Sequence, residues 1–255
     1  MLGAIIGDIV GSIYERNRIK TKDFPLFREN NRITDDTVCT VAVADILLND
    51  LPPAETMQKW CQRYPRAGYG GNFRRWIYRD PPNPYNSFGN GAAMRVSPAA
   101  FLNQDNLENA LNDSDKVTDI THNHPEGMKG ARATTHAIWL AIQNEKPDVI
   151  RHIISSEYGY DLSMSVDEIR PDYSFDVTCQ GSVPQAIISA LESTSFEDAI
   201  RNAISLGGDS DTLAAIAGPI AEVMHGIPEE LSAEVICEYI NEFQDIFEII
   251  EMLYK

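Results

Sequence analysis

The stretch Gly3–Glu15 reads G-A-I-I-G-D-I-V-G-S-I-Y-E, and its glycines recur at every fourth position. Residues four apart share one face of an α-helix, so this stretch is expected to be a helix with a smooth face that packs closely against another helix. Residues 213–224 are expected to form a second, slim helix, because alanines and Gly218 are frequent there. Such a helix can lie at the centre of a fold, with neighbours close on all sides.

The rest of the chain also has a mainly helical pattern. Apolar residues at helical spacing, with prolines or glycines at several of the ends, predict helices over residues 35–48, 54–64, 71–79, 130–144, 149–157, 184–192, 196–206 and 228–255. Residues 80–85 hold three prolines and are expected to be a loop, and residues 161–181 a loop or a short strand. No alternation of strands with helices supports a parallel sheet. The sequence therefore predicts one compact all-α domain over residues 1–255.

The chain is strongly acidic, with 21 Lys and Arg against 38 Asp and Glu and a net charge of −17. This charge argues against nucleic-acid binding, which needs a basic surface, and against docking on an anionic membrane. No stretch reaches the ~18 apolar residues of a membrane span, and the N-terminus lacks the basic start of a signal peptide. The four cysteines are far apart in the sequence, which favours reduced thiols over a zinc site or disulfides. These features predict a cytoplasmic protein.

Two short acidic strings each open a predicted helix. The first is T-D-D-T at Thr34–Thr37, and the second is G-G-D-S-D-T at Gly207–Thr212. Helix capping alone can explain either string, because Asp and Thr accept hydrogen bonds from the free N–H groups of a first turn. Two such strings carry more carboxylates than caps require. Carboxylates and hydroxyls suit hard ions such as Mg²⁺, Mn²⁺ or Ca²⁺ and not zinc, and four carboxylates favour a two-metal centre.

A third acidic pair is Asp8 with Glu15. Seven residues place them about 20° apart on one helix face, two turns from each other. Charges at this spacing often form a solvated face, but the residues around this pair are apolar. At least one of the two acids is therefore a candidate for a buried or cleft-lining position.

Two further segments could contact a ligand. In Ser87–Arg95, S-F-G-N-G-A-A-M-R, the glycines allow positive φ and the backbone N–H groups can bind phosphate, although a plain turn before a helix is also compatible with this string. The segment lacks the Lys-Ser/Thr of a P-loop, which disfavours an NTPase. In T-H-N-H-P-E, at residues 121–126, one histidine as a metal ligand or substrate contact is favoured over a zinc site.

These strings resemble the ADP-ribosylglycohydrolase family, whose order they follow along nearly the whole chain. The resemblance implies an all-α fold of orthogonally packed helices, with a dinuclear Mg²⁺ or Mn²⁺ centre in a cleft. The metal ligands that it implies are Thr34, Asp35, Asp36, Asp209, Asp211 and Thr212. The residues that it implies for contact with the substrate, including its diphosphate and distal ribose, are Ser87, Phe88, Gly89, Asn90, Gly91 and His122. Glu15 matches an acid that is proposed to activate water in serine-specific relatives, whereas residues 161–183 match no family segment.

The activity implied by the resemblance is metal-dependent hydrolysis of the glycosidic bond in an ADP-ribosylated protein or small molecule, with release of ADP-ribose. Cleavage of an N- or O-ribosyl bond passes through an oxocarbenium-like state, and a carboxylate such as Glu15 or Asp36 could take the proton of the attacking water. Two other functions stay open at this point. One is a non-catalytic ADP-ribose or nucleotide binder with the same fold, and the other is a two-metal phosphoester hydrolase.

Overall fold

The computed structural model describes residues 1–255 and contains helices but only one isolated β-bridge. The predicted all-α fold is therefore confirmed. The α-helices are α1 (Leu2–Gly11), α2 (Asp35–Leu48), α3 (Pro53–Arg63), α4 (Gly71–Trp76), α5 (Ser97–Leu102), α6 (Leu107–Thr118), α7 (Pro125–Ile142), α8 (Pro147–Tyr158), α9 (Val166–Ile169), α10 (Cys179–Leu191), α11 (Phe196–Ser205), α12 (Ser210–His225), α13 (Glu229–Val235) and α14 (Gln244–Leu253). A 3₁₀ turn, η1 (Asn90–Ala92), precedes α5, and a π-helical turn, η2 (Ile236–Ile240), follows α13. None of these helices combines the length and the apolar character needed to cross a bilayer.

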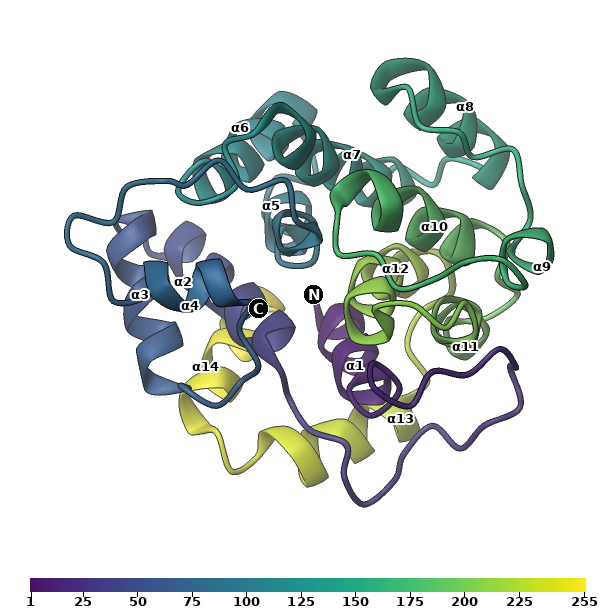
Figure 1. Cartoon of the computed structure of the whole chain (residues 1–255), viewed down its shortest axis with the longest axis horizontal. Helices are drawn as coiled ribbons and strands as arrows, with labels where there is room; N and C mark the ends of the chain where they lie inside the picture. Colours follow the sequence, from purple (N-terminus) through teal and green to yellow (C-terminus); the bar gives the residue numbers. More distant parts are fainter.

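Helices α1 and α12 lie side by side at the centre of the molecule (Figure 1). The glycine face of α1 makes this contact. A Cβ atom placed on Gly3 would lie 2.5 Å from the carbonyl oxygen of Gly218, and one on Gly7 would lie 2.2 Å from that of Ala214. Because real Cβ atoms do not approach backbone so closely, only glycine allows the two helices to pack at this distance. The predicted close-packing face and the predicted slim central helix are both present.

Gly7→Ala is expected to lower the free energy of unfolding by about 3 kcal/mol, the upper end of the usual cost of overpacking. The added methyl group would meet the backbone of Ala214, which cannot move unless α1 and α12 separate. Denaturant unfolding measures the change. Gly71→Ala is the matched control, because nothing lies within 4 Å of a Cβ atom at that position. Equal stability of the two variants would contradict this account of the α1–α12 contact.

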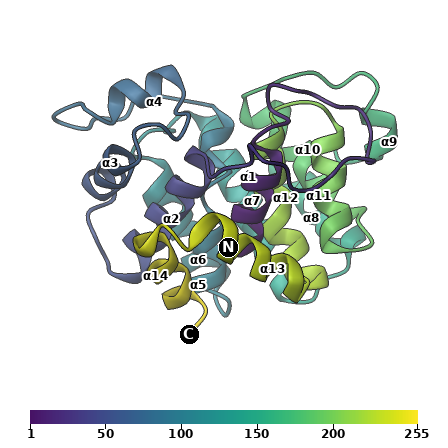
Figure 2. The same ribbon diagram turned by 90° about the horizontal axis from the view of Figure 1, so that it is seen from below.

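The other helices surround this central pair. Helices α7, α10 and α11 pack on α12, and α2 contacts both α1 and α3. Figure 1 shows α2, α3 and α4 on one side of the centre and α8 to α11 on the other, with α5 to α7 along a third side. Figure 2 shows α13 and α14 crossing a further face, where α14 packs on α2. This arrangement brings the N-terminal ends of α2 and α12 together beside the end of α1.

Several helix boundaries differ from the prediction: α7 begins at Pro125 and not at residue 130, and α4 ends at Trp76 and not at residue 79. The first helix ends at Gly11 and not at Glu15, and residues 12–15 form turns. The Ser12 hydroxyl donates to the Ile9 carbonyl, a local bond that competes with continued helix. Helix α10 begins at Cys179 and contains Pro184, which was expected to be its first residue.

Helices α5, α6 and α9 are not predicted by the sequence analysis, and α9 lies in the stretch 161–181 that was expected to be a loop or a short strand. Helix α5 is only six residues long, so it offers less than two turns of apolar periodicity. Helix α6 exposes half of its polar residues and buries four side chains, of which two are polar: Ala110, Ser114, Val117 and Thr118. Its buried face therefore carries a weak apolar signal.

Candidate active site

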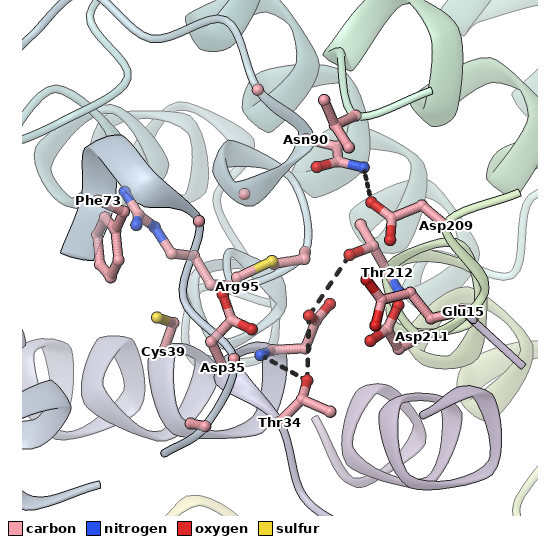
Figure 3. A pocket seen from close by; sticks show the side chains of 18 of the residues that line it. Glu15, Thr34, Asp35, Cys39, Phe73, Asn90, Arg95, Asp209, Asp211 and Thr212 are labelled. Atoms are coloured by element: carbon pink, nitrogen blue, oxygen red, sulfur yellow. Dashed lines mark hydrogen bonds between the residues drawn. The ribbon is translucent and has the colours of Figure 1, made fainter. Parts of the chain in front are cut away.

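A cleft of about 370 Å³ opens where α1, α2 and α12 meet. It is lined by all but one of the site residues predicted from the sequence: Glu15, Thr34, Asp35, Asp36, Ser87, Gly89, Asn90, Gly91, His122, Asp209, Asp211 and Thr212. The exception is Phe88, whose side chain is 45% exposed and whose ring packs 5.2 Å from the ring of His124. Figure 3 shows the acidic side chains converging from two helix starts.

Asp8 lies at the base of this acidic group and is completely buried. Its carboxylate accepts hydrogen bonds from the backbone N–H of Thr34 (2.9 Å) and of Thr37 (3.1 Å). It also accepts from both threonine hydroxyls, with the Thr34 hydroxyl at 2.6 Å. Asp8 therefore provides an anion at the N-terminal end of α2, where the helix dipole favours negative charge.

The tightest carboxylate cluster consists of Asp8, Asp36 and Asp211. One oxygen from each of these three buried residues lies within 4.8 Å of the others. The sequence analysis noted Asp8 as a candidate buried acid but did not include it with the acids of the two strings. Asp36 Oδ1 has no hydrogen-bond partner, although it is buried. A buried carboxylate oxygen without a partner is costly, so this atom is suited to receive a ligand.

Helix capping does not explain the position of Asp209 in the second string. Asp209 occupies the N-cap position of α12, yet its side chain makes no capping hydrogen bond. Its carboxylate instead accepts a 2.7 Å hydrogen bond from the Asn90 side-chain amide (Figure 3). By contrast, the Thr34 hydroxyl does cap α2, because it accepts from the Asp36 N–H at 3.2 Å. Capping thus accounts for part of the first string and does not account for Asp209.

Burial and mutual repulsion disfavour the ionised forms of these acids. Burial, followed by the charge of Asp211, raises the pKa of Asp36 well above its ordinary value. Burial, followed by the charge of Asp209, does the same to the pKa of Asp211. Loss of solvent and the charge of Asp8 raise the pKa of Asp35 to about 7. Such a cluster requires protons or cations to offset its repulsion.

Glu15 reaches the cleft from the turn that follows α1. Its expected position on one helix face with Asp8 is wrong, because α1 has ended four residues earlier. The side chain is half-buried and lines the cleft, and Figure 3 shows it beside Asp211. Its charge contributes to the raised pKa of Asp211 and of Asp209. The turn leaves Glu15 more accessible than the buried cluster.

The glycines of the predicted anion-binding loop have a role other than the expected one. Gly89 has φ of −67°, and neither it nor Gly91 has positive φ. They leave room for neighbours instead. A Cβ atom on Gly91 would lie 3.2 Å from His122 Nε2, and one on Gly89 would lie 3.3 Å from Ser87 Oγ.

Residues 173–178 supply a wall of the cleft that sequence analysis did not assign. Phe175 and Val177 line the cleft, and the Val177 carbonyl accepts a 2.8 Å hydrogen bond from the Asn90 N–H. The isolated β-bridge joins Gly89 to Thr178. The alternation of Tyr173, Phe175 and Val177 was the available signal in the sequence. It indicates an extended segment, and this segment lies beside the Ser87–Gly91 loop.

A family model described as ADP-ribosylglycohydrolase matches residues 1–255. The chain belongs to the ADP-ribosylglycohydrolase family.

Relatives of this ADP-ribosylglycohydrolase family member are distant in sequence but similar in extent. The chain is 25% identical to "ADP-ribosylhydrolase ARH3" of Danio rerio, with 100% of the chain and 89% of that protein covered. It is 24% identical to "ADP-ribosylarginine hydrolase Tri1" of Pseudomonas putida (strain GB-1), covering 89% of the chain and 70% of that protein. A solved structure titled "ADP-ribosylglycohydrolase-related protein complex" has a TM-score of 0.71 at 20% sequence identity. The match covers 99% of this chain and 96% of the chain in that structure. This last match shows the shared fold.

The acidic centre fits a divalent metal ion. Every donor that the cluster offers is a hard oxygen atom, from carboxylates or threonine hydroxyls, as Mg²⁺ and Mn²⁺ prefer. The unpartnered Asp36 Oδ1 and the closely spaced carboxylates are also explained by a cation. No cysteine or histidine belongs to the cluster, which makes zinc a poor fit.

Proposed function

We propose that this chain is a metal-dependent hydrolase that releases ADP-ribose from an ADP-ribosylated protein or small molecule. The observation that carries the proposal is the cleft itself, in which buried carboxylates from the starts of α2 and α12 stand beside the Ser87–Gly91 loop, with Asp8 of α1 buried next to them. Family membership supports the reaction class. The match of one family model to residues 1–255 also supports a single domain.

The metal ligands we propose are Thr34, Asp35, Asp36, Asp209, Asp211 and Thr212, with Asp8 beneath them, for two Mg²⁺ or Mn²⁺ ions. When bound, such ions would supply charge stabilisation for the ribose hydroxyls and the attacking water. Asn90 keeps Asp209 oriented through its 2.7 Å hydrogen bond. Asp8 supports Thr34 through the 2.6 Å hydrogen bond that it accepts from the threonine hydroxyl.

We propose Glu15 as the residue that takes the proton from water. It lines the cleft beside Asp211 and is more accessible than the buried cluster. Asp36, the other candidate base, is 3% exposed and directed at Thr212 and Asp211. Its environment suits a ligand better than a group that exchanges protons with solvent.

The Ser87–Gly91 loop is proposed to bind the diphosphate, and Gly89→Val tests this assignment. A valine fits the backbone φ of −67°, and the first atoms that its Cβ would meet lie 3.3–3.6 Å away. The side chain would, however, occupy the cleft. We expect ADP-ribose binding to weaken by about tenfold while the Tm without ligand changes little, because one blocked contact is worth roughly 1.4 kcal/mol. Parallel losses of Tm and affinity would indicate an ordinary structural turn.

The reaction itself is tested by incubating the protein with a panel of ADP-ribosylated substrates and measuring free ADP-ribose by chromatography. The panel contains arginine-linked, serine-linked, base-linked and small-molecule conjugates. An arginine linkage is included because the name of Tri1 specifies it. Release from at least one linkage is expected. Binding of ADP-ribose without release from any linkage would favour the non-catalytic binder.

A further inference from the structure

His122 presents one ring nitrogen to the cleft. The residue follows α6, is 5% exposed and lines the cleft. Its Nε2 faces the loop, since Cβ atoms on Gly91 and Gly89 would lie 3.2 and 3.6 Å from it. No protein group forms a hydrogen bond with Nε2, whereas Nδ1 has one partner, the Thr121 hydroxyl at 2.8 Å. The side of the ring that faces the loop is therefore free for a ligand.

The proton position on His122 follows from the partners of Thr121. The Thr121 hydroxyl also lies 2.8 Å from Arg95 Nη2. A guanidinium group only donates, so the Thr121 oxygen accepts from Arg95. Thr121 is fully buried, and its hydroxyl proton has no acceptor other than His122 Nδ1. If Nδ1 carried a proton instead, the buried hydroxyl proton would be left without an acceptor, which is costly. The arrangement therefore places the imidazole proton on Nε2.

Arg95 holds the Thr121 hydroxyl in place through its hydrogen bond. Its side chain is 1% exposed and also donates to the Val117 carbonyl at 3.2 Å, and no carboxylate pairs with it. Burial and the nearby Arg95 charge lower the pKa of His122 well below its ordinary value, so the ring stays neutral. Thr121 is tied to the loop as well, because its carbonyl accepts from the Ser87 N–H at 3.3 Å.

We propose that Arg95 and Thr121 are positioning residues, which hold His122 as a neutral Nε2–H donor directed at an anionic group bound on the Gly89–Gly91 loop. This inference rests on the proposed function, in which that anion is the diphosphate of ADP-ribose. Arg95 then acts through hydrogen bonds and need not touch the ligand.

The test compares Thr121→Val, which removes the hydroxyl at constant shape, with Thr121→Ser, which keeps it. Thr135→Val is the matched control, because Thr135 is also fully buried and its hydroxyl has no partner. The protein is labelled with ¹⁵N-histidine, and its five histidines are separated by using His122→Gln to assign the His122 signals. Binding of ADP-ribose is measured by calorimetry on the same proteins.

In the ligand-free wild-type protein, we expect the His122 proton on Nε2 and a hydrogen-bonded, unprotonated Nδ1. Thr121→Val should move the Nδ1 signal towards that of a nitrogen without a partner, whereas Thr121→Ser and Thr135→Val should not. Thr121→Val should also weaken ADP-ribose binding by about 5- to 10-fold, the usual worth of one oriented hydrogen bond. In turnover, KM should rise with kcat nearly unchanged, a split that general destabilisation would not produce.

A wild-type proton on Nδ1, or His122 signals that Thr121→Val leaves unchanged, would overturn the proposal. Equal ADP-ribose affinity in Thr121→Val and Thr121→Ser would overturn it as well. If the wild-type protein did not bind ADP-ribose at all, the proposed function would fail. The positioning of His122 would then be decided by the nitrogen signals alone, which need no ligand.

Discussion

Glu15→Gln is expected to lower kcat for ADP-ribose release by roughly 10²–10⁴, the usual scale for loss of a general base. Glutamine keeps the size and shape of the side chain but cannot accept the proton of the attacking water. The Tm and the response to Mg²⁺ should stay close to those of the wild-type protein, because Glu15 lies outside the buried Asp8–Asp36–Asp211 cluster.

Steady-state kinetics on the substrate released fastest by the wild-type protein measures this effect. Glu29→Gln is the matched control, since Glu29 is an exposed glutamate in the same segment between α1 and α2. Its kcat should match that of the wild type. Normal turnover by Glu15→Gln would remove Glu15 from the mechanism and leave the metal centre untouched.

The second large effect is expected for Asp211→Asn, which removes one charge from the centre of the acidic cluster. Without metal, the variant should be at least as stable as the wild type, because Asp211 is buried among carboxylates that repel it. Its Oδ1 can still accept the hydrogen bond from the Thr212 N–H. With metal bound, the wild type should be more stable than Asp211→Asn.

A bound ion stabilises the folded state by RT ln(1 + [L]/Kd), about 2.7 kcal/mol at a hundredfold excess over Kd. For a chain of this size that free energy corresponds to a rise in Tm of roughly 5–10 °C. Thermal melts with and without Mg²⁺ or Mn²⁺ should show this rise in the wild type and in Asp148→Asn, an exposed control on α8. Asp211→Asn should lose most of the rise and most of the activity. An identical metal-induced rise in Tm in the wild type and in Asp211→Asn would contradict a metal site at Asp211.

The sequence was sufficient to predict the centre of the fold, because the signals there are steric. Gly3 and Gly7 predicted a helix face for close packing, and a Cβ on either would collide with α12 backbone. The two acidic strings likewise predicted which helix starts would line one cleft. Both strings sit at first turns, where side chains can turn towards a shared point.

Other parts of the site depend on tertiary contacts that leave little trace in the sequence. Asp8 lies in an apolar helix, and its place in the cluster depends on its four hydrogen bonds to Thr34 and Thr37. The end of α1 at Gly11 changes how Glu15 enters the cleft. The role of residues 173–178 rests on backbone contacts with the loop, namely the Asn90 N–H bond to the Val177 carbonyl and the β-bridge to Gly89, and the alternation of residues 173, 175 and 177 does not indicate these contacts.

The glycines of the loop line the cleft, but not through the backbone freedom that the sequence suggests. As glycines, Gly89 and Gly91 allow positive φ, but the structure places them in ordinary backbone conformations. They are small because His122 and Ser87 pack against them. Sequence composition cannot separate these two causes, since both require the absence of a side chain.

The most direct test of the account is ADP-ribose release by chelator-treated protein, measured before and after addition of Mn²⁺. The buried carboxylates are proposed to act through a bound divalent ion, so the treated protein should release no ADP-ribose from any substrate of the panel. Addition of Mn²⁺ should restore release in the wild type and fail to restore it in Asp211→Asn. Equal release with and without Mn²⁺ would contradict the metal centre, and no release from any linkage with Mn²⁺ present would contradict the hydrolase.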